Sequence, residues 1–533
     1  MGRTTTRALA LWSFLLASVD ASVAFGQSQN AAPIQVDSSG KTVGGAAPGT
    51  SENPPIEPPL TLLSMDPAAP ELSGLPGGVT PAFGSTPTRP GDWRFDFHGL
   101  VYVPLRVGFN TRLDPQAGQA KEVFHAPPVV PEDFEGFGYT NIEPDPWVQT
   151  NFSYGNRDVT ATVIIAARSV TDGDSYFNPP DQLGINDAFL TFRVAYTPRL
   201  HIKLDVGAFA NRYGNMGEYD SGRYGTPIIA RIGGVGITET GSYNFGSMTL
   251  LSEVGIMGQL NKAPLGVEPA GWNGYLDPNA GTSFVPHLHL GASYLGMGQV
   301  GLHLMRALSQ DDRATPTNQP DGYIDVTAVD ARLTMRRYGH LYAAFSRTGV
   351  NHARAVSDVI QIMNTPGGLG MMNEYLGPNS GVNGSLTTLG AQYDLSVGNL
   401  LRYPAHFDGM GPDLVASVFG IYTAVSSEDP NYNGIKKLKY GAELSYSPLG
   451  WLAISGRYDR VIRDIADPTQ TNATISPRLI FRTGYQARDQ VVLQYSHWFN
   501  GSNVVVDSGA PPAPNPTIRP DVDVLSLMAS MWW

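Results

Sequence analysis

The chain has 533 residues and contains no cysteine, which excludes a disulfide framework and thiol chemistry. Its formal net charge of −12 argues against a nucleic-acid-binding protein, which needs a basic surface. Charged residues make up only 15% of the chain, glycine occurs 60 times, and no run of about 18 apolar residues follows the N-terminus. This composition fits a protein that crosses a membrane with β-strands, and it equally fits a soluble all-β protein.

The N-terminus has the features of an export signal. Arg3 and Arg7 precede a short apolar core over residues 8–19, and small residues at 22–24 form a cleavage site. The core is too short to remain in a bilayer, so we expect residues 1–26 to be a signal peptide. A buried N-terminal helix is the alternative. No cysteine follows the core, so a lipoprotein is not expected.

Residues 27–91 are rich in proline, glycine, alanine and serine and show no sustained period of two or 3.6. Such a segment cannot bury enough apolar surface to offset its conformational entropy. We therefore expect a disordered periplasmic extension, in which residues 60–65 are a candidate docking segment.

An alternating pattern begins at residue 92. Apolar residues, starting with Trp93, occupy nearly every second position through Phe109, and polar residues fill many of the positions between them. A strand of this length far exceeds the ~5–6 residues usual in soluble proteins, whereas strands that cross a membrane need ~9–11 residues. Residues 92–533 are therefore expected to form an all-β, antiparallel transmembrane β-barrel.

The same period recurs in pairs of strands joined by short turns. The predicted hairpins are 147–154 with 159–168, 188–196 with 201–211, 234–245 with 249–259, 285–294 with 299–308, 324–335 with 341–348, 437–446 with 452–461, and 477–485 with 490–498. Longer polar stretches such as 212–233 separate the hairpins, as expected when periplasmic turns are short and extracellular loops are long. We count about 18 strands, and the boundaries also allow 16. The connection 396–413 is unusually long for the short-turn side and leaves room for an extra strand or an inserted turn.

The last strand carries apolar residues on one face and ends in Trp533, while Ser526 and Ser530 fall on the other face. Here the chain resembles the bacterial outer-membrane β-barrel families, whose last strand commonly ends in an aromatic residue that signals to the assembly machinery. The resemblance implies that Trp533 is the assembly signal and that the protein resides in the outer membrane. An edge strand of a soluble sheet is the alternative.

Residues 187–192, followed by 204–209, are similar to a strand pair found in porins of the phosphate-selective type. The lysine-rich ladder of that family is not evident in this chain. The similarity therefore implies a porin-type barrel without implying selectivity for phosphate.

If the apolar positions face lipid, the polar positions between them face the lumen, and a charge-lined lumen holds water. The pattern favours a porin, a channel for passive diffusion of small hydrophilic solutes, and the excess of basic residues favours a mild preference for anions. The alternative is that these residues pair with neighbouring carboxylates and only stabilise the wall. The candidate pore-lining residues are Arg94, Asp96, Arg106, Arg168, Arg193, Lys203, Asp205, Arg332, Lys439, Glu443, Arg457, Arg478 and Arg482.

Porins narrow their lumen with a loop that folds inward. The loop 349–384 is the first candidate, because its segments 355–363 and 367–372 are unusually apolar for an exposed loop. Packing against a neighbouring barrel is the alternative, and the loop 110–146 is a second candidate for either role.

His287 and His289 are expected to share one face of a strand, with His303 on the next strand diagonally near them. Two or three histidines can bind a metal ion. Histidines inside a polar barrel are more often wall residues, so we expect no metal and no other cofactor. No Ser–His pair, phosphate loop, dinucleotide motif or zinc helix stands out, which argues against an enzyme.

Two other classes of function remain open. One is a non-conducting surface barrel that acts as an adhesin, scaffold or specific exporter, and the other is a secreted soluble β-sandwich or propeller lectin. A porin would have outer-membrane lipid, the barrel assembly machinery and small hydrophilic solutes as partners, would form a homotrimer, and would bind no nucleic acid.

Overall fold

A computed structural model describes the strands and most of the short turns of the chain. The described residues are 93–109, 147–156, 158–168, 183–197, 199–215, 227–258, 282–295, 297–310, 322–351, 363–364, 383–401, 412–467, 469, 471–482, 490–501 and 521–532. The predicted signal peptide, the predicted extension, the loop 110–146 and Trp533 lie outside the described residues.

The described residues form one antiparallel sheet with two short helical turns. Its strands are β1 (Arg94–Phe109), β2 (Trp147–Gly155), β3 (Val159–Arg168), β4 (Leu183–Tyr196), β5 (Leu200–Asn215), β6 (Pro227–Asn244), β7 (Met248–Gly258), β8 (Thr282–Tyr294), β9 (Gly298–Gln310), β10 (Gly322–Thr334), β11 (His340–Asn351), β12 (Met363–Asn364), β13 (Gly384–Ser396), β14 (Asp413–Ser427), β15 (Lys436–Leu449), β16 (Leu452–Ile462), β17 (Thr471–Arg482), β18 (Gln490–Asn500) and β19 (Val522–Trp532). The helical turns are η4 (Arg336–Tyr338) and α4 (Val397–Leu401).

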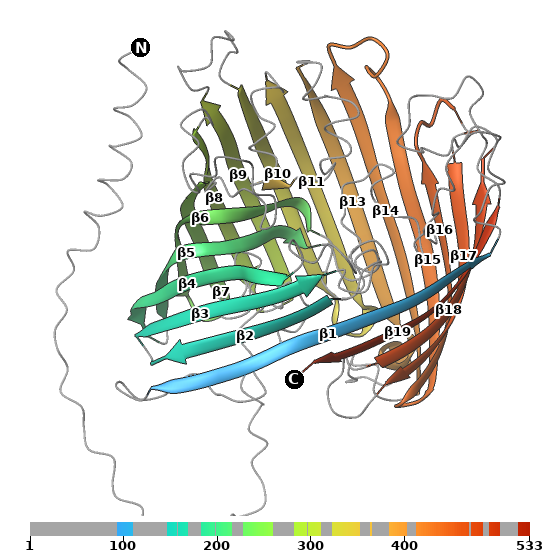
Figure 1. The fold of residues 1–533 in the computed structure, drawn as a ribbon, viewed down its shortest axis with the longest axis horizontal. Helices are drawn as coiled ribbons and strands as arrows, with labels where there is room; N and C mark the ends of the chain where they lie inside the picture. The colour runs from blue at the N-terminus through green and yellow to red at the C-terminus, as the bar shows by residue number, and fades with distance from the viewer. Residues whose placement is uncertain are drawn as a thin grey trace, which may run out of the picture. The chain divides into compact units, whose positions relative to one another are not determined.

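The long strands pair in chain order and the pairing returns to its start (Figure 1). β1 pairs with β2 along one edge and with β19 along the other, so that Val101 lies opposite both Val148 and Met531. β11 pairs directly with β13, which leaves the two-residue β12 outside the ring. The sheet is therefore a closed β-barrel of eighteen long strands, as predicted.

Alternation along each strand separates an apolar outer face from a buried inner face. On β9, Leu302 and Leu304 are exposed, while His303 and Met305, which alternate with them, are buried. The same holds on the last strand, where Leu525 and Leu527 are exposed and Ser526 is buried. A belt of exposed apolar side chains around a barrel without a free edge is what a bilayer requires. The protein is a transmembrane β-barrel.

Within the described part of the chain, no helix is long and apolar enough to cross a membrane. The unusually long connection 396–413 begins with α4, a helical turn directly after β13. Asp413 at the start of β14 accepts a hydrogen bond from the backbone nitrogen of Gly398 at 2.6 Å and one from the Ser396 hydroxyl. The predicted inserted turn is thus present, and it is fixed to the adjacent strand.

β5 and β6 are longer than the strands beside them. The last pair between β4 and β5 is Ala188 with Ala208, and the last pair between β6 and β7 is Val235 with Gly258. Beyond these pairs, residues 209–215 and 227–234 form a two-stranded extension, which we call the inward hairpin. The prediction of a loop over 212–233 is therefore wrong for 212–215 and 227–233, which are strand.

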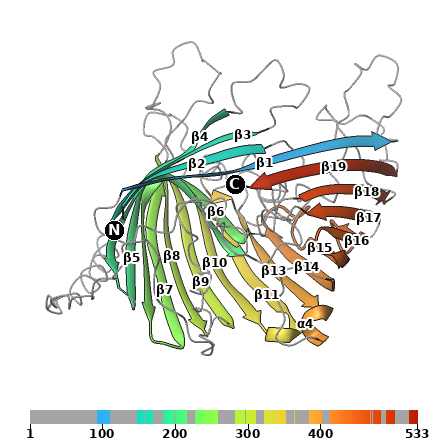
Figure 2. The same ribbon diagram turned by 90° about the horizontal axis from the view of Figure 1, so that it is seen from below.

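The inward hairpin crosses the interior of the barrel. Its strands approach β10 and β11, which are neighbours of neither β5 nor β6 in the ring. On its free edge, β12 adds two further pairs, including Met363 with Ile232. Figure 2 shows the end of β6 inside the ring formed by the other strands. Of the loop 349–384, which was predicted to fold inward, the described residues 363–364 do join this element.

Candidate functional site: the inner wall of the barrel

The structure places eight of the predicted pore-lining side chains and leaves five outside its description. The five are Arg94, Asp96, Arg106, Arg168 and Arg482, for which only the strand position is described. The other eight alternate with residues that are exposed or half-buried, and so they lie on the inner face: Arg193, Lys203, Asp205, Arg332, Lys439, Glu443, Arg457 and Arg478. Seven of them fall into two groups on different parts of the wall, and the structure adds a third group. The eighth is Lys439, whose Nζ lies 6.0 Å from the ring centre of Phe419.

The first group lies on β4 and β5 and at β10. Lys203 forms an ion pair with Asp205 at 3.5 Å, and Asp205 also accepts a hydrogen bond from Thr191 at 2.7 Å. Arg193 instead donates to the hydroxyl of Thr160 at 2.9 Å and to a backbone carbonyl. The guanidinium of Arg332 lies 5.4 Å from the ring centre of Tyr342. Basic side chains here therefore have mixed partners, some of them uncharged.

The second group, which we call the charge group, consists of Glu443, Ser455, Arg457, Asp459 and Arg478 on β15–β17. Arg457 makes a two-pronged contact with Asp459, through Nε at 2.7 Å and Nη2 at 2.9 Å. Glu443 forms an ion pair with Arg478 and accepts a hydrogen bond from Ser455 at 2.7 Å. For Lys203, Arg457 and Arg478, the geometry matches the alternative interpretation, in which basic residues pair with neighbouring carboxylates.

The third group lies on β7–β10, and the strand register assembles it. Glu253 on β7 lies directly opposite His289 on β8, and His289 lies opposite His303 on β9. Residues opposite one another on the same face of a sheet have their Cβ atoms ~4.5–5.5 Å apart, so their side chains meet. We call the following residues the histidine cluster: Tyr213, Glu253, His287, His289, His303 and Asp330.

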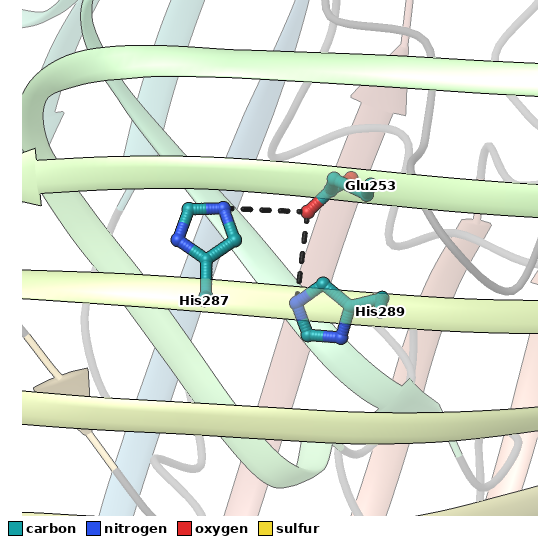
Figure 3. Close-up of side chains that lie close together, drawn as sticks. All are labelled: Glu253, His287 and His289. Atoms are coloured by element: carbon teal, nitrogen blue, oxygen red, sulfur yellow. Dashed lines mark ion pairs between the residues drawn. The ribbon is translucent and has the colours of Figure 1, made fainter. Parts of the chain in front are cut away.

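Glu253 faces two members of the histidine cluster, His287 and His289 (Figure 3). Its Oε1 lies 3.6 Å from Nε2 of His287 and 3.7 Å from Nε2 of His289. Tyr213, from the inward hairpin, donates a hydrogen bond to the same oxygen at 2.7 Å. The ring of Tyr213 also stacks on that of His289, with the centroids 3.9 Å apart. The inward hairpin is thus fastened to the wall at this point, and Glu253 and His289 are fully buried beneath it.

A chain of side-chain contacts extends from His289 along the wall. Nδ1 of His289 lies 2.6 Å from Nδ1 of His303, and Nε2 of His303 lies 3.0 Å from a carboxylate oxygen of Asp330. His287 has a separate partner for its second nitrogen, because its Nδ1 lies 3.4 Å from the backbone carbonyl of Val285. Each of the three imidazole rings therefore has at least one ring nitrogen in contact with a neighbouring group, which sets the orientation of the ring.

Glycines on the inner face leave room for these rings. A Cβ atom at Gly255 would lie 2.5 Å from the ring of His287, and one at Gly301 would lie 2.4 Å from the carboxylate of Asp330. Both distances are shorter than any ordinary non-bonded contact. The glycines thus allow bulky polar side chains to lie flat against the wall.

The proximity of His287, His289 and His303 agrees with the expectation from sequence. Sequence analysis missed Glu253 as their partner, although its place in the alternation of β7 indicated an inner-face carboxylate beside His289. It also missed Tyr213, because that residue falls in a segment predicted to be a loop. No sequence pattern indicates that β5 extends beyond its pairing with β4 and bends into the barrel.

No family model and no curated protein matches this chain. Similar solved structures include OccAB3 of Acinetobacter baumannii, with a TM-score of 0.39, 9% identity, and coverage of 83% of this chain and 100% of that chain. The anion-selective porin from Comamonas acidovorans has a TM-score of 0.37 and 9% identity, with coverage of 83% and 100%. OmpT, an outer membrane protein of Vibrio cholerae, has a TM-score of 0.36 and 9% identity, with coverage of 84% and 100%. At these identities and TM-scores the likeness decides nothing about this protein, whose assignment as a barrel rests on its own strand pairings.

Proposed function

We propose that this protein is a porin of the Gram-negative outer membrane, which forms a water-filled channel for passive diffusion of small hydrophilic solutes. The observation that supports it is the closed ring of eighteen long strands with a polar and charged inner face. Barrels of 16–18 strands are wide enough to enclose an aqueous channel. Barrels of this kind belong to outer membranes, which agrees with the export signal predicted at residues 1–26.

The inward hairpin would constrict this channel from the wall at β7–β11. Its apolar residues, among them Phe209, Ile229 and Ile232, pack in one cluster with inner-face residues such as Met305 and Val326. That packing would exclude water from the part of the lumen beside β7–β11. The mild anion preference rests on basic side chains such as Arg193, which donates to uncharged oxygens and has no carboxylate partner among the described residues.

Single-channel recording tests the proposal. We expect the refolded full-length protein to give stable ohmic conductance steps in a planar bilayer, with a reversal potential in a KCl gradient that indicates weak anion selectivity. An unboiled gel, on which a folded barrel shifts in migration, verifies folding. A folded barrel that never conducts would exclude the porin proposal.

A second candidate function has one observation in its favour. Inner-face side chains on β15–β18 are also buried, as Lys437 and Ser476 are with 0% exposed. Walls of an open channel lie in water, so this burial favours a filled lumen and a non-conducting surface barrel. The same recording separates the two proposals, because the filled barrel folds without conducting. Recognition of Trp533 by the assembly machinery and a homotrimeric state remain predictions.

A further inference from the structure

We propose that Glu253, His287 and His289 bind one Zn²⁺ ion on the inner wall of the barrel, beneath the inward hairpin. One ligand atom from each residue lies within 4.8 Å of the other two, and all three residues are buried. The proposal does not depend on whether the barrel conducts.

The contacts behind the two histidines determine which nitrogen of each faces Glu253. The carboxylate of Asp330 accepts a hydrogen bond, so Nε2 of His303 donates to it at 3.0 Å and Nδ1 of His303 is left as an acceptor. His289 then donates through Nδ1 to His303 at 2.6 Å, which leaves a lone pair on Nε2 of His289. Thus the relay from Asp330 presents His289 as a neutral metal ligand.

His287 is also neutral with its lone pair on Nε2, and a single backbone contact is enough to fix this tautomer. Its Nδ1 lies 3.4 Å from the carbonyl oxygen of Val285, which can only accept a hydrogen bond. Nδ1 therefore carries the proton, and the lone pair of His287 is on Nε2. Thr238 lies 3.4 Å from this nitrogen, which is close to the limit of a hydrogen bond. Histidines that bind metals almost always donate their other ring N–H to a carbonyl, a carboxylate or another fixed group, and both histidines follow this pattern.

Three groups with lone pairs therefore converge on one buried point. The distances of 3.6 and 3.7 Å from Oε1 of Glu253 to the two imidazole nitrogens are too long for hydrogen bonds. In the described part of the chain, Nε2 of His289 and Oε2 of Glu253 have no hydrogen-bond partner. An unsatisfied acceptor in a buried site is costly, and a cation bound by Oε1 of Glu253 and the two imidazole nitrogens would satisfy Nε2 of His289.

The spacing suits zinc. With bonds of ~2.1 Å in a tetrahedral arrangement, ligand atoms lie about 3.4 Å apart, close to the separations from Glu253 to the two histidines. Two histidines and one glutamate are also an established ligand set for zinc, whereas magnesium and calcium prefer oxygen ligands alone. Since Tyr213 donates to the glutamate, the ion would hold β7, β8 and the inward hairpin together.

Zinc content provides the test. Full-length protein without a polyhistidine tag is folded in detergent, stripped with a chelator and dialysed against Zn²⁺, and bound zinc is then measured by mass spectrometry. We expect one ion per chain. We expect His289→Gln to abolish tight binding and Asp330→Asn, which alters only the contact behind the ligand, to weaken affinity about 10–100-fold.

His497→Gln is the matched control, because His497 also contacts a carboxylate, that of Asp523, at 2.6 Å. This variant should bind zinc as the unaltered protein does. If His289→Gln fails to fold, Co²⁺ bound to the unaltered protein still tests whether the site exists, because Co²⁺ in a tetrahedral site of nitrogen and oxygen ligands absorbs visible light. A folded barrel that binds no zinc, or binds it equally well as His289→Gln, would overturn the proposal.

Discussion

The inner wall of this barrel satisfies its buried polar groups in two different ways. On β15–β17, the charge group places opposite charges side by side, with Arg457 against Asp459 and Glu443 against Arg478. On β7–β10, the histidine cluster directs acceptors toward a single carboxylate oxygen, that of Glu253, and is covered by the inward hairpin. The first arrangement pairs its charges on its own strands. The second needs a contribution from outside its own strands, which Tyr213 supplies in part.

The largest expected effect comes from breaking the self-contained arrangement. Asp459→Asn would remove the charge of the carboxylate that the buried Arg457 contacts through two nitrogens. Removing one partner of a buried pair typically lowers the free energy of unfolding by about 3–5 kcal/mol. Urea titration of the protein folded into lipid vesicles measures this loss. Replacing both partners, as in Arg457→Met with Asp459→Leu, should return stability close to that of the unaltered protein.

An ion pair on the outer face serves as the control for this prediction. Arg306 and Asp325 lie 3.2 Å apart, but their side chains are 49% and 44% exposed. Water screens such a pair, so Asp325→Asn should change stability by less than about 1 kcal/mol. If Asp325→Asn and Asp459→Asn lowered the unfolding free energy equally, burial would not explain how much the charge group contributes to stability.

The contrast between the two regions also shows where sequence analysis succeeds. Alternation with a period of two identified both inner faces correctly, because strand geometry sends successive side chains to opposite sides. It placed Glu443, Arg457 and Arg478 on the inner face, and it identified a barrel of about 18 strands. Glu443 is on β15 and Arg478 is on β17, with β16 between them. Their pairing depends on the register of all three strands, which no local sequence pattern predicts.

The histidine cluster includes a contact that local sequence patterns do not predict. His287 and His289 are two residues apart and are recognisable in the sequence, whereas Tyr213 is 40 residues from the Glu253 that it contacts. The segment around Tyr213 contains polar residues and glycines and so was predicted to be a loop. It is a strand because it pairs with β6 and packs on the inner wall, and that stabilisation is tertiary.

A smaller effect is expected from loosening the inward hairpin. Tyr213→Phe removes the hydrogen bond to Glu253 and keeps the ring that stacks on His289. A typical hydrogen bond contributes about 0.5–1.5 kcal/mol, and each 1.4 kcal/mol corresponds to a factor of ten in an equilibrium. Amide hydrogen exchange in residues 209–215 should therefore become about 2–10-fold faster. Tyr440→Phe on β15 should leave these rates unchanged, and unchanged rates in Tyr213→Phe would mean that the hairpin is held by its apolar packing alone.

The smallest expected effect concerns ion selectivity, and it compares two basic residues on neighbouring strands. Arg193 donates to uncharged oxygens, whereas Lys203 has Asp205 at 3.5 Å. A charge beside its counter-charge acts on passing ions as a dipole, whose field falls off faster than that of a single charge, and salt weakens both at distances near the Debye length of ~8–10 Å. Arg193→Gln should therefore move the reversal potential in a KCl gradient toward cation selectivity by more than Lys203→Gln does.

Neither Arg193 nor Lys203 is fully buried, so the unfolding free energy should change by no more than about 1 kcal/mol in either variant. A larger shift for Lys203→Gln would mean that Asp205 does not neutralise it toward the lumen, and that the paired residues set the selectivity.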